Sequence, residues 1–431
     1  MLCLGPQGTA GQRLPTAGDP ILTIVRLRLA AHSQYPLQLG LTVLLWQAST
    51  GVYVLSLAQR YLPDELGAGV AYPGYAMALY AAGRFLLQTP AGVLADHFGR
   101  RQVLMAGIAV SLPAVLLMLT VQDAGAFLAC SALYGAGSAA VWPSIMAYVG
   151  DTHAPERRAR TLNMLNLSQL IGLGLGTMAG VTLIDFISYQ AAFAACLSFS
   201  GVALAFAYRG SRTEVVSRQP ASPEPGGPGL FRRLRSPRIL MLAGIALLLS
   251  VSATVQAPVV VVYSSDVLHT KMYMLGLMLL APAAVAGYLA VKYGHLADRF
   301  GRQIPLIGGL GVAAVSYYAL SVTTHPLLAM HLVVLAGLGY VVSVPAWGAA
   351  ALDATELGGR GMMLGVLATV QGFGGAVGQA IGGLTNAAWG PVAPFKLGAI
   401  LLVLALALTL MQLRQQRRSE RSADSAKRLA A

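Results

Sequence analysis

The sequence lacks the charge that a water-exposed protein surface requires. Asp, Glu, Lys and Arg make up 10% of its 431 residues, whereas soluble domains carry about 25%. Hydrophobic residues make up 56%, and the mean hydropathy is +0.65. This composition excludes an ordinary soluble fold and predicts a protein that lies in a lipid bilayer.

The sequence is also poor in groups for catalysis or metal binding. The three cysteines, Cys3, Cys130 and Cys196, are isolated and have neither disulfide nor metal-ligand spacing. We recognise no nucleophile–base arrangement, metal-ligand cluster or phosphate-binding loop in the sequence. We therefore predict that the protein is not an enzyme and needs no cofactor or metal.

Long apolar runs are what the sequence has in abundance. Each has about 20 residues, the length that an α-helix needs to cross a bilayer, and none alternates as the strands of a barrel do. We predict an all-α membrane protein with twelve transmembrane helices. The predicted spans are 37–58, 68–90, 102–120, 124–149, 161–184, 187–208, 237–263, 271–291, 303–323, 326–350, 361–385 and 392–413.

The spans fall into two groups of six. A stretch rich in Pro, Gly, Ser and Arg separates them and is typical of a flexible linker. We predict an N-terminal arm (1–35), a six-helix bundle (36–208), the linker (209–236), a second six-helix bundle (237–413) and a basic tail (414–431).

Basic residues indicate the orientation of the chain. Of the 29 Lys and Arg residues, all but Arg60, Arg84, Lys271 and Lys396 fall in segments on one side of the membrane. Basic residues in short loops face the cytoplasm. We predict a cell-membrane protein with both termini cytoplasmic and its basic segments close to anionic lipid. The net charge of +13 is then a topology signal, and we expect no nucleic-acid partner.

A repeat runs through the chain. GVLADHFGRR begins at Gly92 and GHLADRFGRQ at Gly294, an offset of 202 residues. The same offset takes Asp151 to Asp353, Arg158 to Arg360, and Gly172, Gly176 and Gly180 to Gly374, Gly378 and Gly382. We predict two parallel, pseudo-symmetric halves.

The repeated phrase resembles the signature loop between the second and third helices of the major facilitator superfamily, with His97 where Arg is commoner. The resemblance covers 37–413 and implies the fold of that superfamily. It also implies a conformational latch at the cytoplasmic side, although the loop could be a topology anchor alone. The implied latch residues are Gly92, Asp96, Gly99, Arg100, Arg101, Asp151, Arg158, Gly294, Asp298, Gly301, Arg302, Asp353 and Arg360. Gly92 is expected to let two helix ends approach closely.

The glycines of the fifth span resemble an antiporter pattern of this superfamily in part. Thr177 stands where the pattern has Pro, and Val181 where it has Gly. Ser131 occupies the position at which those antiporters carry an Arg in the fourth helix. We favour helix packing as the role of the glycines, and the sequence does not support the standard proton relay of the antiporters.

Arg84 is the basic residue that lies well inside a span. Burying an Arg at the centre of a membrane helix costs about 2.5–3.5 kcal/mol. One hypothesis is that Arg84 faces a central cavity and binds an acidic or phosphate group; the alternative is that it snorkels to the cytoplasmic face or caps neighbouring carbonyls. Further candidates for substrate contact are Trp46, Thr50, Tyr53, Trp142, Asn166, Gln256 and Gln371, each of which could serve helix packing instead.

These observations predict a secondary transporter that works by alternating access. We favour export of a hydrophobic or amphipathic small molecule, with a coupling proton or other ion as a further partner. The alternatives are uptake of an organic anion through Arg84, translocation of a lipid or glycolipid, and a non-transporting receptor on the same scaffold.

Overall fold

The computed structural model describes residues 37–152, 155–210, 237–270, 303–353 and 360–430, together with Met274 and Val285. Within these ranges the chain is helical, with short turns and no strand. The predicted arm, most of the predicted linker and most of the predicted span 271–291 lie outside the described residues. The other predicted spans fall on helical segments, which confirms the all-α membrane architecture.

The first half starts with a helix at Leu37–Asp64, which contains a π-helical turn, η1 (Tyr53–Leu57), followed by α2 (Ala58–Asp64). The helices that follow are α3 (Tyr72–Phe98), α4 (Arg100–Thr120), α5 (Ala124–Ser138), α6 (Val141–Thr152), α7 (Pro155–Phe186) and α8 (Tyr189–Gly210). The fourth predicted span is thus two helices, α5 and α6, that join at Ala139 and Ala140.

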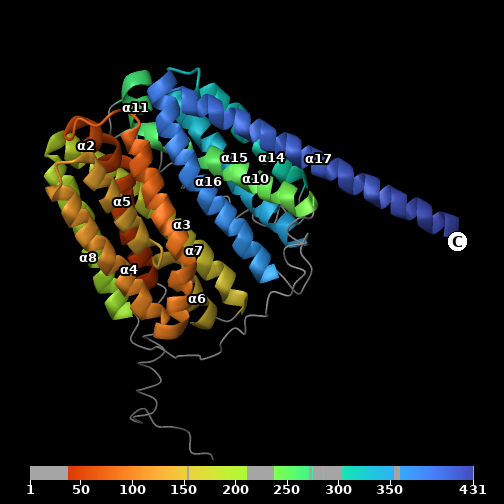
Figure 1. The fold of residues 1–431 in the computed structure, drawn as a ribbon, viewed down its shortest axis with the longest axis horizontal. Helices are drawn as coiled ribbons and strands as arrows, with labels where there is room; N and C mark the ends of the chain where they lie inside the picture. The colour runs from red at the N-terminus through yellow and green to blue at the C-terminus, as the bar shows by residue number, and fades with distance from the viewer. Residues whose placement is uncertain are drawn as a thin grey trace, which may run out of the picture.

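The second half starts with α10 (Pro237–Thr254), the 3₁₀ turn η2 (Ala257–Val259), α11 (Val260–Val262) and the π turn η3 (Tyr263–Val267). Its other described helices are α14 (Gln303–Leu320), α15 (Pro326–Asp353), α16 (Arg360–Trp389) and α17 (Ala393–Ala430). α17 runs on through the predicted tail as helix, well beyond the bundle (Figure 1). Nine helices of the described residues are long and apolar enough to cross a membrane.

The repeat is visible in the packing of each half. Tyr61 contacts Phe193 in the first half at a ring-centroid distance of 5.1 Å. Their equivalents 202 residues later, Tyr263 and Phe395, make the same contact in the second half at 4.5 Å. The two halves are therefore built on one plan, as the offset in the sequence predicts.

The glycine series packs helices closely within each half. In the first half, Gly172 and Gly176 of α7 lie against the backbone of Leu44 and Ala48. In the second half, Gly378 of α16 lies against the backbone of Val251. A side chain at these positions would overlap backbone atoms of the neighbouring helix, so the glycines serve the helix packing that we favoured from the sequence.

The two halves meet towards one end of the bundle. We call this the Gln59 end, and the opposite end, which carries the α3–α4 turn, the Asp96 end. Gly74 of α3 lies against Gly383 of α16, and further along Phe85 packs on Gly372. Beyond this level α3 exposes Leu86, which is 62% accessible. Figure 1 shows α3 and α16 close together beside α2 and α11 and further apart towards the other end.

Candidate functional site

A cavity lies within the first half. Its lining comes from five helices: Val43, Trp46 and Gln47 from the first helix, Arg84 from α3, Ser138 from α5, Val141, Trp142 and Ile145 from α6, and Gln169 from α7. The space inside it that a water-sized molecule can enter is about 10 Å³, which is room for about one water molecule. Sites for drug-sized ligands measure about 300–1,000 Å³, so a molecule of that size fits only in a wider conformation of the cavity.

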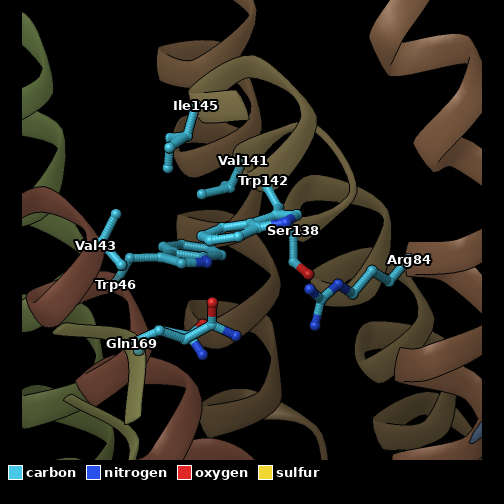
Figure 2. Close-up of a pocket in the computed structure, with 9 residues that line it drawn as sticks. Val43, Trp46, Arg84, Ser138, Val141, Trp142, Ile145 and Gln169 are labelled. Atoms are coloured by element: carbon cyan, nitrogen blue, oxygen red, sulfur yellow. The ribbon is translucent and has the colours of Figure 1, made fainter. Parts of the chain in front are cut away.

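Two tryptophans form the aromatic wall of the cavity. Trp46 is 3% exposed, and its ring stacks on Tyr134 at a centroid distance of 5.8 Å. Trp142 is half-buried, and Figure 2 shows its indole beside that of Trp46. Two adjacent indoles offer a large, rigid apolar face, which is suited to a planar or hydrophobic group.

Arg84 provides the charge of the cavity. Its side chain is half-buried and reaches from α3 into the cavity towards Ser138 (Figure 2). Within the described ranges, no carboxylate forms an ion pair with Arg84. A guanidinium donates hydrogen bonds in a fixed fork that matches a carboxylate or a phosphate. Arg84 thus lines a cavity of the first half, whereas the sequence predicted a central cavity; its binding of an acidic group stays a prediction.

The break between α5 and α6 positions part of this lining. The N–H of Ala139 donates to the carbonyl oxygens of Gly135 and Ala136, at 3.0 and 3.2 Å, so the helix tightens as α5 ends. Ser138 closes α5, and Trp142 lies in the first turn of α6. The break thus brings a hydroxyl and an indole to the same cavity.

The other predicted contact residues lie elsewhere. Tyr53 is fully buried among the rings of Tyr80, Phe127 and Tyr134, so it belongs to the core of the first half. Thr50 is buried too, and its hydroxyl donates to the Trp46 carbonyl oxygen at 3.1 Å. These two residues do not line the cavity. Tyr53 does share a helical face with Trp46, since both rings contact Tyr134, but it lies about two turns further along the helix, in the core.

Asn166, Gln256 and Gln371 are also absent from the lining. Asn166 is exposed on α7. Gln256 donates to the Tyr317 hydroxyl at 2.5 Å, within the second half. The Gln371 carbonyl oxygen accepts a hydrogen bond from Ser250 Oγ at 2.5 Å, which joins α16 to α10.

Six lining residues are not among the predicted contact residues: Val43, Gln47, Ser138, Val141, Ile145 and Gln169. Three are apolar residues of apolar runs, which look alike whether they face lipid, protein or a cavity. Ser138 lies in a run of small residues, Gly-Ala-Gly-Ser-Ala-Ala, where only the helix break distinguishes it.

A charged cluster occupies the Asp96 end of the first half. Arg100 Nη2 lies 2.8 Å from Asp96 Oδ1, and Arg100 Nε lies 3.1 Å from Asp151 Oδ2. Arg101 donates to the Tyr208 carbonyl oxygen at 2.6 Å, with its guanidinium 5.1 Å from the Tyr208 ring centroid. The two arginines thereby connect the start of α4 to α3, α6 and α8.

The two glycines of this loop differ in their roles. Gly99 has φ of +97° between α3 and α4, a conformation that side chains disfavour, so a glycine is needed there. In the part of the chain that the structure describes, a Cβ added at Gly92 would meet nothing within 4 Å. The close approach of helix ends at Gly92 is not seen there and stays a prediction.

The remaining latch candidates are not placed. Gly294, Asp298, Gly301 and Arg302 lie outside the described residues. Arg158, Asp353 and Arg360 lie in helices, in α7, α15 and α16, but their side chains are not among those described.

The architecture defines a class: a multi-pass helical membrane protein of two homologous halves, with a cavity in the membrane region. The family model for the Major Facilitator Superfamily matches residues 39–294 and 242–430. The chain therefore belongs to this superfamily and is a membrane transporter.

Among curated proteins, the chain is similar to tetracycline resistance protein class C of Escherichia coli, with 28% identity over 286 residues, or 62% of this chain and 68% of that protein. It is also similar to the multidrug resistance protein MdtL of Salmonella schwarzengrund, with 32% identity over 124 residues. The second match spans 29% of this chain and 31% of MdtL.

Solved structures share the fold at low sequence identity. The nucleoside transporter NupG superposes with a TM-score of 0.74 at 12% identity, over 88% of this chain and 99% of NupG. The human organic anion transporter MFSD10 superposes with a TM-score of 0.62 at 15% identity, over 88% and 99% of the two chains. At such identities the likeness concerns the fold alone.

Proposed function

We propose that this transporter exports an amphipathic small molecule by alternating access. The observation that carries the proposal is the cavity in which Trp46, Trp142 and Arg84 meet. Two relatives are named as resistance proteins, one for tetracycline and one for multiple drugs, which favours export over uptake.

The distribution of charge indicates the orientation in the membrane. Arg100, Arg101 and Arg209 lie at the Asp96 end of the first half, and Arg60 is its basic residue at the Gln59 end. By the positive-inside rule, the Asp96 end faces the cytoplasm. The contacts between the halves at the Gln59 end then belong to a conformation that is closed on the outside, in which a substrate enters the cavity from the cytoplasmic side.

The cavity lining favours a substrate with an acidic group. Arg84 is the charged residue among the nine that line the cavity, and the indoles beside it are apolar. A molecule with a planar hydrophobic body and a carboxylate or phosphate would satisfy both features. An organic anion is thus the substrate class that we propose, and uptake of such an anion is the second candidate function.

The charged cluster at the Asp96 end has a place in the same cycle. We propose that Asp96, Arg100 and Asp151 form the first-half part of a latch that holds the cytoplasmic side shut when the outside is open. The ion pairs fix the α3–α4 turn as a rigid unit. Such a unit can dock against the second half without rearrangement.

The test is transport by purified protein in proteoliposomes. A matched set of dyes with one aromatic body and a carboxylate, a neutral or a cationic substituent would be offered, with and without an imposed proton gradient. We expect movement of the carboxylate dye in preference to the other two. A cationic dye moved in preference would overturn the substrate class, and absence of movement for every dye under every gradient would count against export of amphipathic molecules.

A further inference from the structure

A single side chain bridges the two halves at the Gln59 end. Gln59 lies on α2 and is 1% exposed. Its Nε2 donates to the carbonyl oxygen of Ala257 at 2.9 Å, and its Oε1 accepts from the backbone N–H of Val261 at 3.1 Å. Both partners belong to the second half. We call this pair of hydrogen bonds the Gln59 bridge.

The two partners of Gln59 are four residues apart in one span. In an unbroken α-helix, the N–H of Val261 would donate to the carbonyl of Ala257. In this structure the Gln59 Nε2 donates to the Ala257 carbonyl in place of the Val261 N–H, and the Gln59 Oε1 accepts from Val261 in place of the Ala257 carbonyl. The Gln59 amide thus lies within the hydrogen-bond ladder of the seventh span. The seventh span is broken at Pro258, which has no N–H to donate to the carbonyl of Thr254, so α10 ends at Thr254 and η2 and α11 follow. The Gln59 amide bonds to two backbone groups at this break.

The surroundings of the bridge are dry. Val261 is 2% exposed and packs on Val181 of α7. Val259 is fully buried, and Ala257 packs against the hydrophobic core of the first half. Buried backbone groups of this kind must find partners inside the protein. Among the described residues, the Gln59 amide is a partner of both.

The first half is shaped to present Gln59. The π turn η1 at Tyr53–Leu57 ends two residues before Gln59. A π turn adds a residue to the helix and so rotates everything after it, and such turns occur often at functional sites. The turn is the element that directs Gln59 towards the second half.

Gln59 and Val261 are also equivalent positions of the repeat, since they are 202 residues apart. Contact between equivalent positions places the bridge at the local two-fold axis between the halves. The second half has Val where the first has Gln, so the bridge is one-sided. A valine side chain cannot return the same two hydrogen bonds.

We propose that Gln59 is a gating residue of the transport cycle. With the Gln59 end closed, its amide bonds to the two backbone groups beside the break at Pro258. When that end opens, Gln59 withdraws and the N–H of Val261 bonds to the carbonyl of Ala257, so that the helix after the break begins at Ala257. The backbone groups are satisfied in both arrangements, which gives the gate two discrete states. This inference rests on the alternating access proposed above.

The experiment measures which end is open. Spin labels in place of Ile187 and Trp389 report on the Gln59 end, and labels in place of Phe98 and Ile304 report on the Asp96 end; all four side chains are well exposed. Distances would be recorded by double electron–electron resonance in lipid bilayers, with the native cysteines replaced.

The informative variant is Gln59→Leu, which keeps the size of the side chain and removes both hydrogen bonds. We expect it to raise the population that is open at the Gln59 end by about tenfold, which corresponds to about 1.4 kcal/mol. Gln59→Asn keeps the amide but is one methylene shorter, so it should shift the population in the same direction, and it serves if the Leu variant does not fold.

The matched control is Ser56→Ala. Ser56 lies less than one turn before Gln59, is fully buried, and donates to the Thr177 carbonyl oxygen at 3.2 Å within its own half. It should leave the population unchanged. If two states exchange but Gln59→Leu does not shift their populations, the role of Gln59 is overturned and alternating access stands. The same holds if Ser56→Ala shifts the populations equally. One fixed distance at each end, in every variant and with substrate, would overturn alternating access itself.

Discussion

Arg100 and Asp151 form an ion pair, with Nε and Oδ2 3.1 Å apart, that joins the start of α4 to the end of α6. The same guanidinium lies 2.8 Å from Asp96 of α3. One arginine thus connects three helices of the first half at the end that we assign to the cytoplasm. The cavity is distant from this cluster along α3. We therefore assign the cluster a role in the motion of the helices and not in contact with the substrate.

We predict that Arg100→Ala slows turnover and leaves substrate affinity unchanged. Arg100 is 20% exposed and its acidic partners are 61% and 39% exposed, so each pair contributes about 1 kcal/mol or less. The transport rate should fall severalfold at an unchanged KM. Asp123→Asn is the control, because Asp123 caps α5 by accepting from the Ala126 N–H, away from the cluster. A rise in KM without loss of rate would refute this assignment.

The prediction for Arg84 concerns selectivity. Arg84→Ala removes the positive charge of the cavity, and a hydrogen bond to a charged group contributes about 1.5–3 kcal/mol. The KM for a carboxylate dye should therefore rise by about 10–100-fold, whereas that for its neutral analogue should stay within about twofold. Arg84→Lys should lie between, since Lys keeps the charge without the bidentate fork. Unchanged transport of the carboxylate dye by both variants would end the proposal.

The aromatic wall predicts a loss of binding in Trp142→Ala. An aromatic contact contributes about 0.5–1.5 kcal/mol beyond its buried area, so the affinity for an aromatic substrate should fall by about tenfold, while Trp142→Phe should retain much of it. Affinity can be followed by quenching of the remaining indole emission. Trp389→Ala is the control, because Trp389 is 74% exposed at the far end of α16. Equal losses in both variants would show that the wall is not a binding surface.

The glycine contacts predict effects on stability. In Gly176→Ala the new Cβ would lie 2.6 Å from the Cα of Ala48, and the helices would have to separate. Overpacking of this kind costs about 1–3 kcal/mol. Gly201→Ala is the control, because a Cβ there meets nothing within 4 Å. Thermal unfolding in detergent should show a lower transition temperature for Gly176→Ala alone; the packing role fails if both variants unfold like the native chain.

The architecture was predictable because it depends on repeated, local signals. The length of the apolar runs is set by the thickness of the bilayer. The offset of 202 residues is visible in the sequence, and in the structure the same offset relates the contact of Tyr61 with Phe193 to that of Tyr263 with Phe395. The clustering of Asp96, Arg100 and Asp151 also agrees with the motif.

The cavity was predictable in part. Arg84 and the two tryptophans stand out as residues that are costly or unusual in a membrane helix. Tyr53 was misplaced because helical periodicity predicts the face on which a residue lies and not its depth: Tyr53 shares a face with Trp46, since both rings contact Tyr134, but it is buried in the core. Gln59 gave no signal, because its partners are backbone atoms 198 and 202 residues away that become available only through a break in another helix.

The most direct test of the account is the accessibility of the cavity from each side of the membrane. Gln169 lines the cavity and is half-buried, so Gln169→Cys would be made with Cys3, Cys130 and Cys196 replaced. A membrane-impermeant thiol reagent would then be applied to intact cells and to inverted vesicles. Alternating access predicts that the new cysteine reacts from both sides and that a bound substrate protects it from both. Reaction from one side alone, whatever substrate is present, would contradict the account.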